Sequence, residues 1–302
     1  MDVSIILVSY NTKELTENCI KSVYEKTQEL DYDIWVIDNN SHDDSCKMIK
    51  EEFPQVKLIE SKENLGFGKA NNLAIKQSNA KYIFLLNTDT VLINNAIKIL
   101  FDYMEENQNV GCCGGQLYNT DMTLQGSTGP FDDLNYLIKK SFGLNWISRI
   151  NRFKHIFRKN FSIEKTNDQT VNVPSEADYI IGADMMIRKS TLDKSGLFDE
   201  RFFMFAEEAE LCFRINESGF KIMFVPEAKI IHFGGGTTNK TNQSIEVEKM
   251  RLTSNILFYE ICYGKGKLAK VLYIIYYLRY FFLRFFSVKA FERLKMSIEI
   301  NI

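Results

Sequence analysis

The 302-residue sequence has few of the residues that mark non-globular or metal-stapled chains. It contains only four prolines and no Gly/Ser-rich or repeated stretch, which excludes a collagen-like, solenoid or disordered chain. None of its six cysteines forms a CxxC pair, and Cys112 and Cys113 are adjacent, an arrangement unsuited to a structural zinc. With 45% apolar and 25% charged residues, the composition is that of a globular protein with one large or two modest domains.

Common nucleotide-binding and targeting motifs are also missing. There is no GxxxxGK(S/T) P-loop, and Asn71 stands where a dinucleotide fingerprint beginning at Gly66 and Gly68 needs its third glycine. The N-terminus has no basic region and only a short apolar run from Val3 to Val8, so we expect no signal peptide and a cytosolic location.

Basic charge is concentrated in two aromatic-rich segments. Residues 134–163 contain seven Lys or Arg and no acid, and residues 264–302 contain eight against two acids. The longest uncharged run of the second segment is eight residues, far below the roughly 20 needed to span a bilayer. The pattern indicates basic amphipathic helices that touch a membrane surface, or helices packed on the main domain with their Lys and Arg in water. No recognition motif supports a nucleic-acid partner.

The first part of the sequence alternates apolar runs with helical patterns. This alternation predicts an α/β fold, with a doubly wound sheet and helices on both faces. The expected strands are Val3–Val8, Ile34–Ile37, Val56–Ile59 and Tyr82–Leu86. A helix is expected from Asn71 to Gln77.

Polar residues follow three of the expected strands. Asn11, Asp38 and Asp89 lie where parallel strands end, and in such folds ligands bind beyond the carboxyl ends of the strands. Asp38 suits a base or ribose, and Asp89 suits a hard cation, since Mg²⁺ needs only one or two carboxylates beside phosphate oxygens and water. The alternative for Asp89 is a turn or helix-capping acid.

A second group of candidates lies between Gly182 and Thr238. Glu207, Glu208 and Glu210 follow an aromatic cluster, and a carboxylate at such a helix start can act as a general base. Acids in a first helical turn are also favoured by the helix dipole alone. His232 ends an apolar run before three glycines, where it is either a ligand or a structural histidine.

Seven short motifs together resemble family 2 glycosyltransferases, most closely the rhamnosyltransferase-like branch that builds bacterial surface polysaccharides. In chain order they are Val8–Asn11, Val36–Ser41, Asn64–Phe67, Leu86–Asp89, Gly182–Ala183, Glu207–Glu208 and His232. The resemblance covers about residues 1–240 and implies a GT-A fold, a Rossmann-like nucleotide-binding sheet. It implies a domain at 1–240 with a variable acceptor-side segment at 118–177. The basic, aromatic-rich pattern after it predicts a helical extension at 241–302 that either associates with a membrane or packs on the main domain.

The resemblance also implies roles for individual residues. Asp38 matches the base-recognising acid, and Asp89, with Asn87 in place of a first Asp, matches the carboxylate that binds Mg²⁺ or Mn²⁺. His232 matches a residue that completes the metal site in some members. The implied donor-binding residues are Ser9, Tyr10, Asn11, Asp38, Asn40, Asn64, Gly66, Phe67, Asn71, Asn87 and Thr88. Gly182, Ala183 and Asp184 are expected on the acceptor side.

The expected catalytic base departs from the family pattern. Glu208 stands where relatives carry Asp, and the extra methylene moves the carboxylate by roughly 1 Å, which alters acceptor geometry. Glu207 is the alternative base. The implied reaction transfers a sugar, rhamnose in this branch, with inversion from a nucleoside-diphosphate sugar to a glycan or lipid-linked acceptor at the cytoplasmic face of the inner membrane.

Several alternatives stay open at the level of sequence. The donor is equally a hexose, N-acetylhexosamine or galactofuranose nucleotide, and the Glu208 substitution fits a catalytically impaired nucleotide-sugar-binding protein. A sugar-phosphate nucleotidylyltransferase is disfavoured, because such an enzyme needs a glycine-rich N-terminal loop with Arg and Lys, which Ser9–Thr12 does not resemble.

Overall fold

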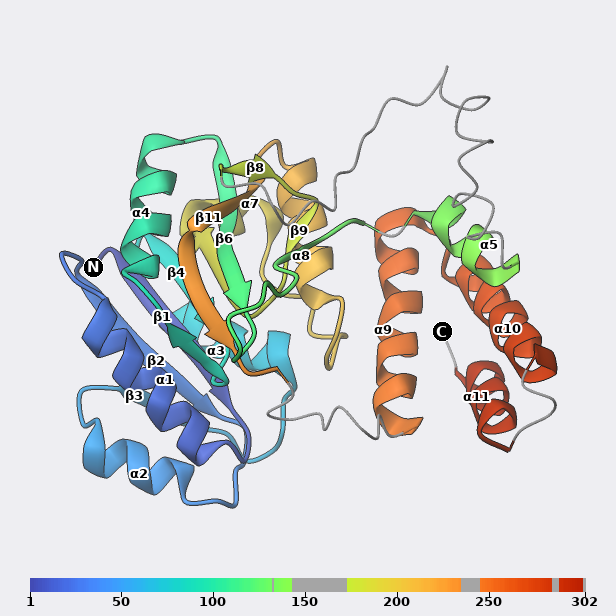
Figure 1. The fold of residues 1–302 in the computed structure, drawn as a ribbon, viewed down its shortest axis with the longest axis horizontal. Coiled ribbons are helices and arrows are strands. Elements are labelled where there is room, and N and C mark those ends of the chain that lie inside the picture. Colours follow the sequence, from blue (N-terminus) through green and yellow to red (C-terminus); the bar gives the residue numbers. More distant parts are fainter. Residues whose placement is uncertain (132, 143–172, 235–244, 284–287, 301–302) are drawn as a thin grey trace. The chain divides into compact units, whose positions relative to one another are not determined.

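The computed structural model describes all residues except 132, 143–172, 235–244, 284–287 and 301–302 (Figure 1). The described chain divides into two compact units. Unit 1 comprises residues 1–129 and 173–234, and unit 2 comprises residues 130–142 and 245–300 apart from the gaps named above.

Unit 1 is built around a nine-stranded mixed sheet in the order β3-β2-β1-β4-β10-β6-β11-β5, with β8 paired to β11. Its strands are β1 (Val3–Ser9), β2 (Tyr32–Asp38), β3 (Lys57–Glu60), β4 (Tyr82–Leu86), β5 (Thr90–Leu92), β6 (Val110–Tyr118), β8 (Ser175–Glu176), β10 (Asp184–Arg188) and β11 (Lys221–His232). A separate two-stranded sheet pairs β7 (Thr128–Gly129) with β9 (Tyr179–Ile180). Strands β1 to β4 run parallel, whereas β10 runs antiparallel to both β4 and β6.

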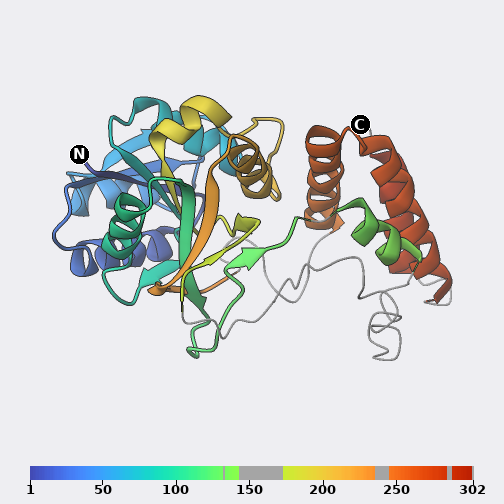
Figure 2. The ribbon, with the colours of Figure 1, turned by 90° about the horizontal axis from the view of Figure 1, so that it is seen from above.

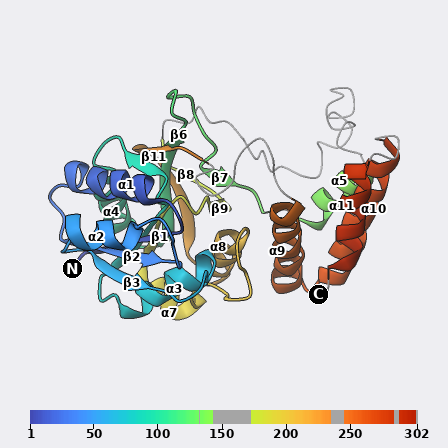
Figure 3. The same cartoon turned by 90° about the horizontal axis from the view of Figure 1, so that it is seen from below.

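Helices cover both faces of this sheet, as the alternating sequence pattern predicts (Figure 3). They are α1 (Lys13–Lys26), α2 (Ser45–Glu52), α3 (Phe67–Gln77), α4 (Ala96–Glu106), α7 (Lys189–Ser195) and α8 (Glu207–Glu217). On one face, side chains of α1, α2 and α4 share a core with alternate residues of the strands. The intervening strand residues, such as Ile6, Ile83 and Leu85, are buried on the other face. Burial on both faces explains the continuous apolar runs of the sequence.

The predicted strand ranges are confirmed, with small differences at their ends. Tyr82–Leu86 forms β4 with the predicted bounds, and β1 extends the range Val3–Val8 by one residue. The helix predicted from Asn71 begins four residues earlier, at Phe67. A tertiary contact sets this start, since the Phe67 N–H donates to the Phe203 carbonyl 3.0 Å away, and local sequence does not reveal such a contact.

The order of the strands brings late residues beside early ones. β6 and β11 run side by side and parallel, seen as the green and orange strands at the centre of Figure 2. The last residues of β11 then pair antiparallel with β5, with His232 opposite Thr90. This pairing places His232 at the strand edge where Asp89 lies.

Unit 2 is helical, consisting of α5 (Leu134–Phe142), α9 (Ile245–Tyr263), α10 (Gly266–Leu283) and α11 (Val288–Glu299). Its core is rich in tyrosine and aliphatic side chains from all four helices, including Leu137, Ile256, Tyr273 and Met296. Within the described residues, no helix is both long and apolar enough to cross a membrane.

Candidate active site

The carboxyl ends of β1, β2 and β4 form one edge of the sheet, where the sequence places most donor-binding candidates. Ser9 is the register partner of Asp38 across β1 and β2. The Thr12 and Thr88 hydroxyl oxygens lie 3.2 Å apart, which joins the turn after β1 to the turn after β4. The structure therefore brings the first, second and fourth strand-end motifs together.

Asp38 is a buried carboxylate with one oxygen left over. It is 2% exposed, and the Ser41 N–H donates to its Oδ1 at 2.9 Å. Its Oδ2 has no hydrogen-bond partner among the described residues. Because a buried polar atom without a partner costs free energy, this oxygen is suited to accept a hydrogen bond from a ligand.

The turns after β1 and β2 hold each other in left-handed conformations. Asn11 and Asn40 have φ of 54° and 66°, a region that asparagine tolerates better than most residues. The His42 N–H donates to Asn11 Oδ1 at 2.8 Å, and the Asn11 N–H donates to Ser41 Oγ at 2.9 Å. Tyr10, which lies between Ser9 and Asn11 in the sequence, is exposed at this edge.

Gly66 is fixed by close approach of the backbone before α8. Its φ is +78°, and a Cβ there would meet the Phe203 carbonyl oxygen at 2.1 Å. Asn64 Oδ1 accepts the Gly66 N–H at 2.9 Å, which shapes the turn into α3. One turn later, Asn71 Nδ2 donates to the Phe67 carbonyl at 3.0 Å, while its buried Oδ1 has no partner among the described residues. These four predicted donor residues thus form one local structure.

Asp89 and His232 are the acid and imidazole that the sequence proposes for a metal. His232 Nε2 lies 3.3 Å from Asp89 Oδ1, and both side chains are largely buried. His232 Nδ1 lies 2.8 Å from Gln125 Oε1, and Gln125 Nε2 in turn donates to Asn119 Oδ1 at 3.3 Å. Since an amide oxygen only accepts, Nδ1 carries a proton, and Nε2 faces the carboxylate of Asp89.

This donor set fits a divalent cation bound together with a diphosphate. An outer hydrogen bond that fixes the histidine tautomer is the usual second layer of a metal site. Among the described residues no group of three or more His, Cys, Asp or Glu side chains could hold a metal ion. Two protein ligands leave positions for phosphate oxygens and water, as is common for Mg²⁺.

Glu207 and Glu208 begin α8 in different surroundings. Glu207 is 4% exposed, and burial, followed by the charge of Glu208, raises its pKa well above the usual value. Its Oε2 has no hydrogen-bond partner among the described residues. Burial also raises the pKa of Glu208, while backbone interactions with its own N–H and with Gly182 act in the opposite direction. Burial thus raises the pKa of both carboxyl groups, and the increase is larger for Glu207.

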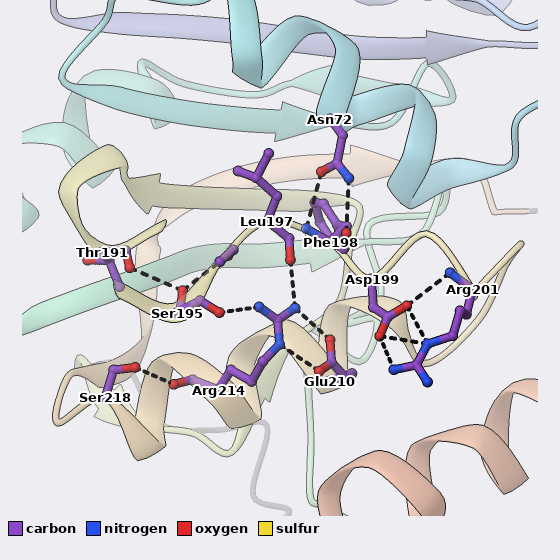
Figure 4. A network of polar contacts seen from close by, with 11 residues as sticks. Asn72, Thr191, Ser195, Leu197, Phe198, Asp199, Arg201, Glu210, Arg214 and Ser218 are labelled. Atoms are coloured by element: carbon purple, nitrogen blue, oxygen red, sulfur yellow. Dashed lines mark hydrogen bonds and ion pairs between the residues drawn. The ribbon is translucent and has the colours of Figure 1, made fainter. Parts of the chain in front are cut away.

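A polar network anchors the loop that carries these two acids (Figure 4). The Arg214 guanidinium donates to both carboxylate oxygens of Glu210, at 2.6 Å each, and to the carbonyls of Ser195 and Leu197. At the same end of the loop, Asn72 forms two hydrogen bonds with the backbone of Phe198. These bonds tie the segment after α7 to α8 and to α3, while two successive non-glycine residues just before α8, Phe205 and Ala206, have positive φ.

The predicted acceptor-side residues lie at the start of β10. The Asn87 N–H donates to the Ala183 carbonyl at 3.0 Å, and a Cβ on Gly182 would lie 3.7 Å from Glu208 Cβ. Gly182 thus lies beside Glu208. Asp184 is fully buried instead, where its Oδ2 accepts the Gly115 N–H at 2.6 Å and burial raises its pKa well above the usual value.

Sequence reasoning missed three residues that support the site. Gln125 positions His232, and Asn72 positions the loop at Phe198. Arg214 positions α8. Only Arg214 carries a local signal, its spacing of four residues from Glu210 on one helix. The other two act across long sequence separations, which no local pattern reveals.

Comparison with known proteins decides the family. The family model described as "Glycosyl transferase family 2" matches residues 4–169, more than half of the chain. The chain belongs to glycosyl transferase family 2. It is a glycosyltransferase, and its fold is the GT-A fold, as the motifs predict.

Two similar curated glycosyltransferases align along most of their lengths. The N-acetylglucosaminyl-diphospho-decaprenol L-rhamnosyltransferase of Mycobacterium tuberculosis is 23% identical over 78% of this chain and 77% of its own. The rhamnosyltransferase WbbL of Escherichia coli K12 is 23% identical over 76% of this chain and 83% of its own. Among solved structures, GalNAc-T7 with UDP, GalNAc and Mn²⁺ superposes with a TM-score of 0.63 at 15% identity. That match covers 99% of this chain and 56% of the GalNAc-T7 chain.

Proposed function

We propose that this glycosyltransferase inverts configuration as it moves a sugar from a nucleoside-diphosphate sugar to a glycan or lipid-linked acceptor in surface polysaccharide synthesis. The observation that carries the proposal is the Asp89–His232 pair, 3.3 Å apart at the strand edge that also holds Asp38. Such a transfer needs a carboxylate that binds the nucleobase or ribose, which is the role proposed for Asp38. It also needs groups that hold the metal and diphosphate, and a carboxylate that acts as general base.

The donor is proposed to lie along the strand ends. Asp38 Oδ2, which has no partner among the described residues, accepts a hydrogen bond from the base or ribose. Asp89 and His232 would hold Mg²⁺ or Mn²⁺, which neutralises charge developing on the departing diphosphate. The Mn²⁺ and UDP named for GalNAc-T7 support this assignment. Asn11, Asn64 and the other predicted donor residues shape the turns that surround it.

Glu208 is proposed as the general base. It removes the proton of the acceptor hydroxyl as that oxygen attacks the anomeric carbon from the face opposite the diphosphate. The electrostatics support Glu208 over Glu207, because a base must be ionised before transfer and burial raises the pKa of Glu207 further than that of Glu208. Gly182, beside Glu208, is positioned to border the acceptor.

The proposed donor sugar is rhamnose and the proposed acceptor is glycan or lipid-linked, on the strength of the two similar rhamnosyltransferases. Such an acceptor implies peripheral contact with the cytoplasmic face of the inner membrane. The boundaries at 1–240, 118–177 and 241–302 remain proposals, in which the first range transfers the sugar and the last contacts the membrane.

A thermal-shift matrix tests the donor and the metal together. The full chain is melted with dTDP, UDP or GDP, each with EDTA, Mg²⁺ or Mn²⁺, because ligand that binds the folded state raises the melting midpoint. We expect a metal-dependent rise with dTDP that is lost in Asp89→Asn. A rise with UDP instead would shift the donor to a hexose or N-acetylhexosamine. No rise with any nucleotide contradicts the proposed donor site.

A further inference from the structure

Helix α10 of unit 2 is apolar on the face opposite its buried face. Ala269, Leu272, Tyr273 and Tyr277 face the unit's own core. The opposite side of α10 carries a stripe of large apolar residues that recur every three or four positions: Leu268, Val271, Ile275, Leu278 and Phe282. Four of these five are classed as exposed, between 41% and 56%, and Ile275 is half-buried. A helix that is apolar all round needs cover on both faces, and the described residues of unit 2 cover only one of them.

The stripe ends in an aromatic cluster. The Phe281 ring lies 5.8 Å from the Phe282 ring and 5.9 Å from the Phe291 ring of α11, measured between centroids. Phe291 is itself 54% exposed. Apolar surface therefore continues from the end of α10 onto the neighbouring helix, an extent that exceeds the scattered single residues of an ordinary wet surface.

The charge of the same helix selects among possible partners. α10 carries Lys267, Lys270 and Arg279 and contains no Asp or Glu. Lys267, at its exposed start, borders the stripe. Anionic lipid headgroups complement these basic side chains, and the acyl region below receives the apolar side chains.

We propose that the α10 stripe is a membrane-docking surface, with Leu268, Val271, Ile275, Leu278 and Phe282 in the interface of an anionic bilayer and Lys267 and Lys270 among its headgroups. The helix then lies in the plane of the membrane surface. The purpose of this contact, access to a lipid-linked acceptor, rests on the proposed function. The contact itself is measured without sugar transfer, so the two proposals fail independently.

Vesicle co-sedimentation of the full chain tests this surface. The vesicles are phosphatidylcholine with and without phosphatidylglycerol, at low and high salt. We expect binding to the anionic vesicles, and a loss of about tenfold or more in partitioning for Val271→Glu/Leu278→Glu, since each side chain is withdrawn from an apolar environment. Lys267→Gln/Lys270→Gln should lose about fivefold for each lysine at low salt, and less at high salt.

Matched controls separate the stripe from general effects. Met122→Glu places the same charge on a residue of unit 1 that is 52% exposed, against 51% for Val271, and should leave binding unchanged. Lys26→Gln, at the exposed end of α1, controls for loss of a positive charge. Melting curves and light scattering are recorded for every variant, to verify folding and to measure self-association.

Two results would overturn the proposal. One is equal vesicle binding by Val271→Glu/Leu278→Glu and the unaltered chain, or no binding by the unaltered chain. The other is a result in which the unaltered chain self-associates and Val271→Glu/Leu278→Glu abolishes self-association but not vesicle binding. That result would assign the stripe to contact with a second copy of the chain.

Discussion

Replacing Glu207 by Gln gives a direct test of the charge state of the buried pair. Glu207 is 4% exposed, and burial together with the Glu208 charge raises its pKa well above the usual 4.5. Gln has nearly the same shape as the protonated acid but no proton to release. The substitution therefore isolates the contribution that one proton makes to the pH dependence of stability.

The sign of that contribution follows from proton linkage. Above pH 4.5 the unfolded chain releases the Glu207 proton while the folded chain retains it, so the free energy of unfolding falls as pH rises towards the folded pKa. One proton corresponds to a slope of about 1.4 kcal/mol per pH unit. Relative to the unaltered chain, Glu207→Gln should therefore gain about 1.4 kcal/mol for each pH unit across this window.

Urea unfolding at a series of pH values above 4.5 measures this difference. A constant offset between the two chains only reports how well the amide fits, so the slope of the difference is the quantity that decides. Glu217→Gln, on the exposed end of the same helix, is the matched control and should show no slope. A flat difference for Glu207→Gln as well would refute a neutral Glu207 and remove the argument that distinguishes it from Glu208.

Three further substitutions have expected outcomes. Glu208→Gln should lower transfer by about 10² to 10⁴-fold in a product assay while leaving the nucleotide-induced melting shift near normal, whereas an active Gln variant would exclude Glu208 as base. Arg214→Met leaves Glu210, which is 1% exposed, without its cation and should lower the free energy of unfolding by about 3–5 kcal/mol in urea. The double variant Glu210→Gln/Arg214→Met should recover much of that free energy. No recovery would mean that the two side chains are not coupled. Gly66→Ala, whose Cβ would meet the Phe203 carbonyl oxygen at 2.1 Å, should weaken both stability and nucleotide binding, with Gly219→Ala as a control that shares positive φ but has open space around it.

The parts of the fold that depend on local pattern were predictable from the sequence. β4 is buried along its whole length, and its continuous apolar run gives both its existence and its bounds. The position of Asp38 at the end of a strand follows from the same alternation of strands and helices. Both depend only on neighbouring residues, which is why a single sequence reveals them.

Features that depend on tertiary contacts were not predictable. The antiparallel insertion of β10 between β4 and β6 leaves no mark in its own five residues. Gln125 fixes the tautomer of His232 across 107 positions of sequence, and neither residue carries a pattern that names the other. Burial of Asp184 within the sheet likewise depends on the room that Gly114 leaves beside it and on the Gly115 N–H that donates to its Oδ2.

The distribution of unsatisfied polar atoms is an independent argument for the location of the site. Among the described residues, eight buried side-chain nitrogen or oxygen atoms have no hydrogen-bond partner, and three of these belong to proposed site residues: Asp38, Asn71 and Glu207. A fourth belongs to Asp184, which is buried within the sheet. Elsewhere the chain satisfies even a difficult buried group, since Arg188, 6% exposed, donates to the Tyr82 hydroxyl and to the Val110 and Met104 carbonyls. At Asp38 a bound ligand can supply the missing partner, and at Glu207 a bound proton can. The polar atoms that folding leaves unsatisfied therefore favour the same site as the motifs, on different physical grounds.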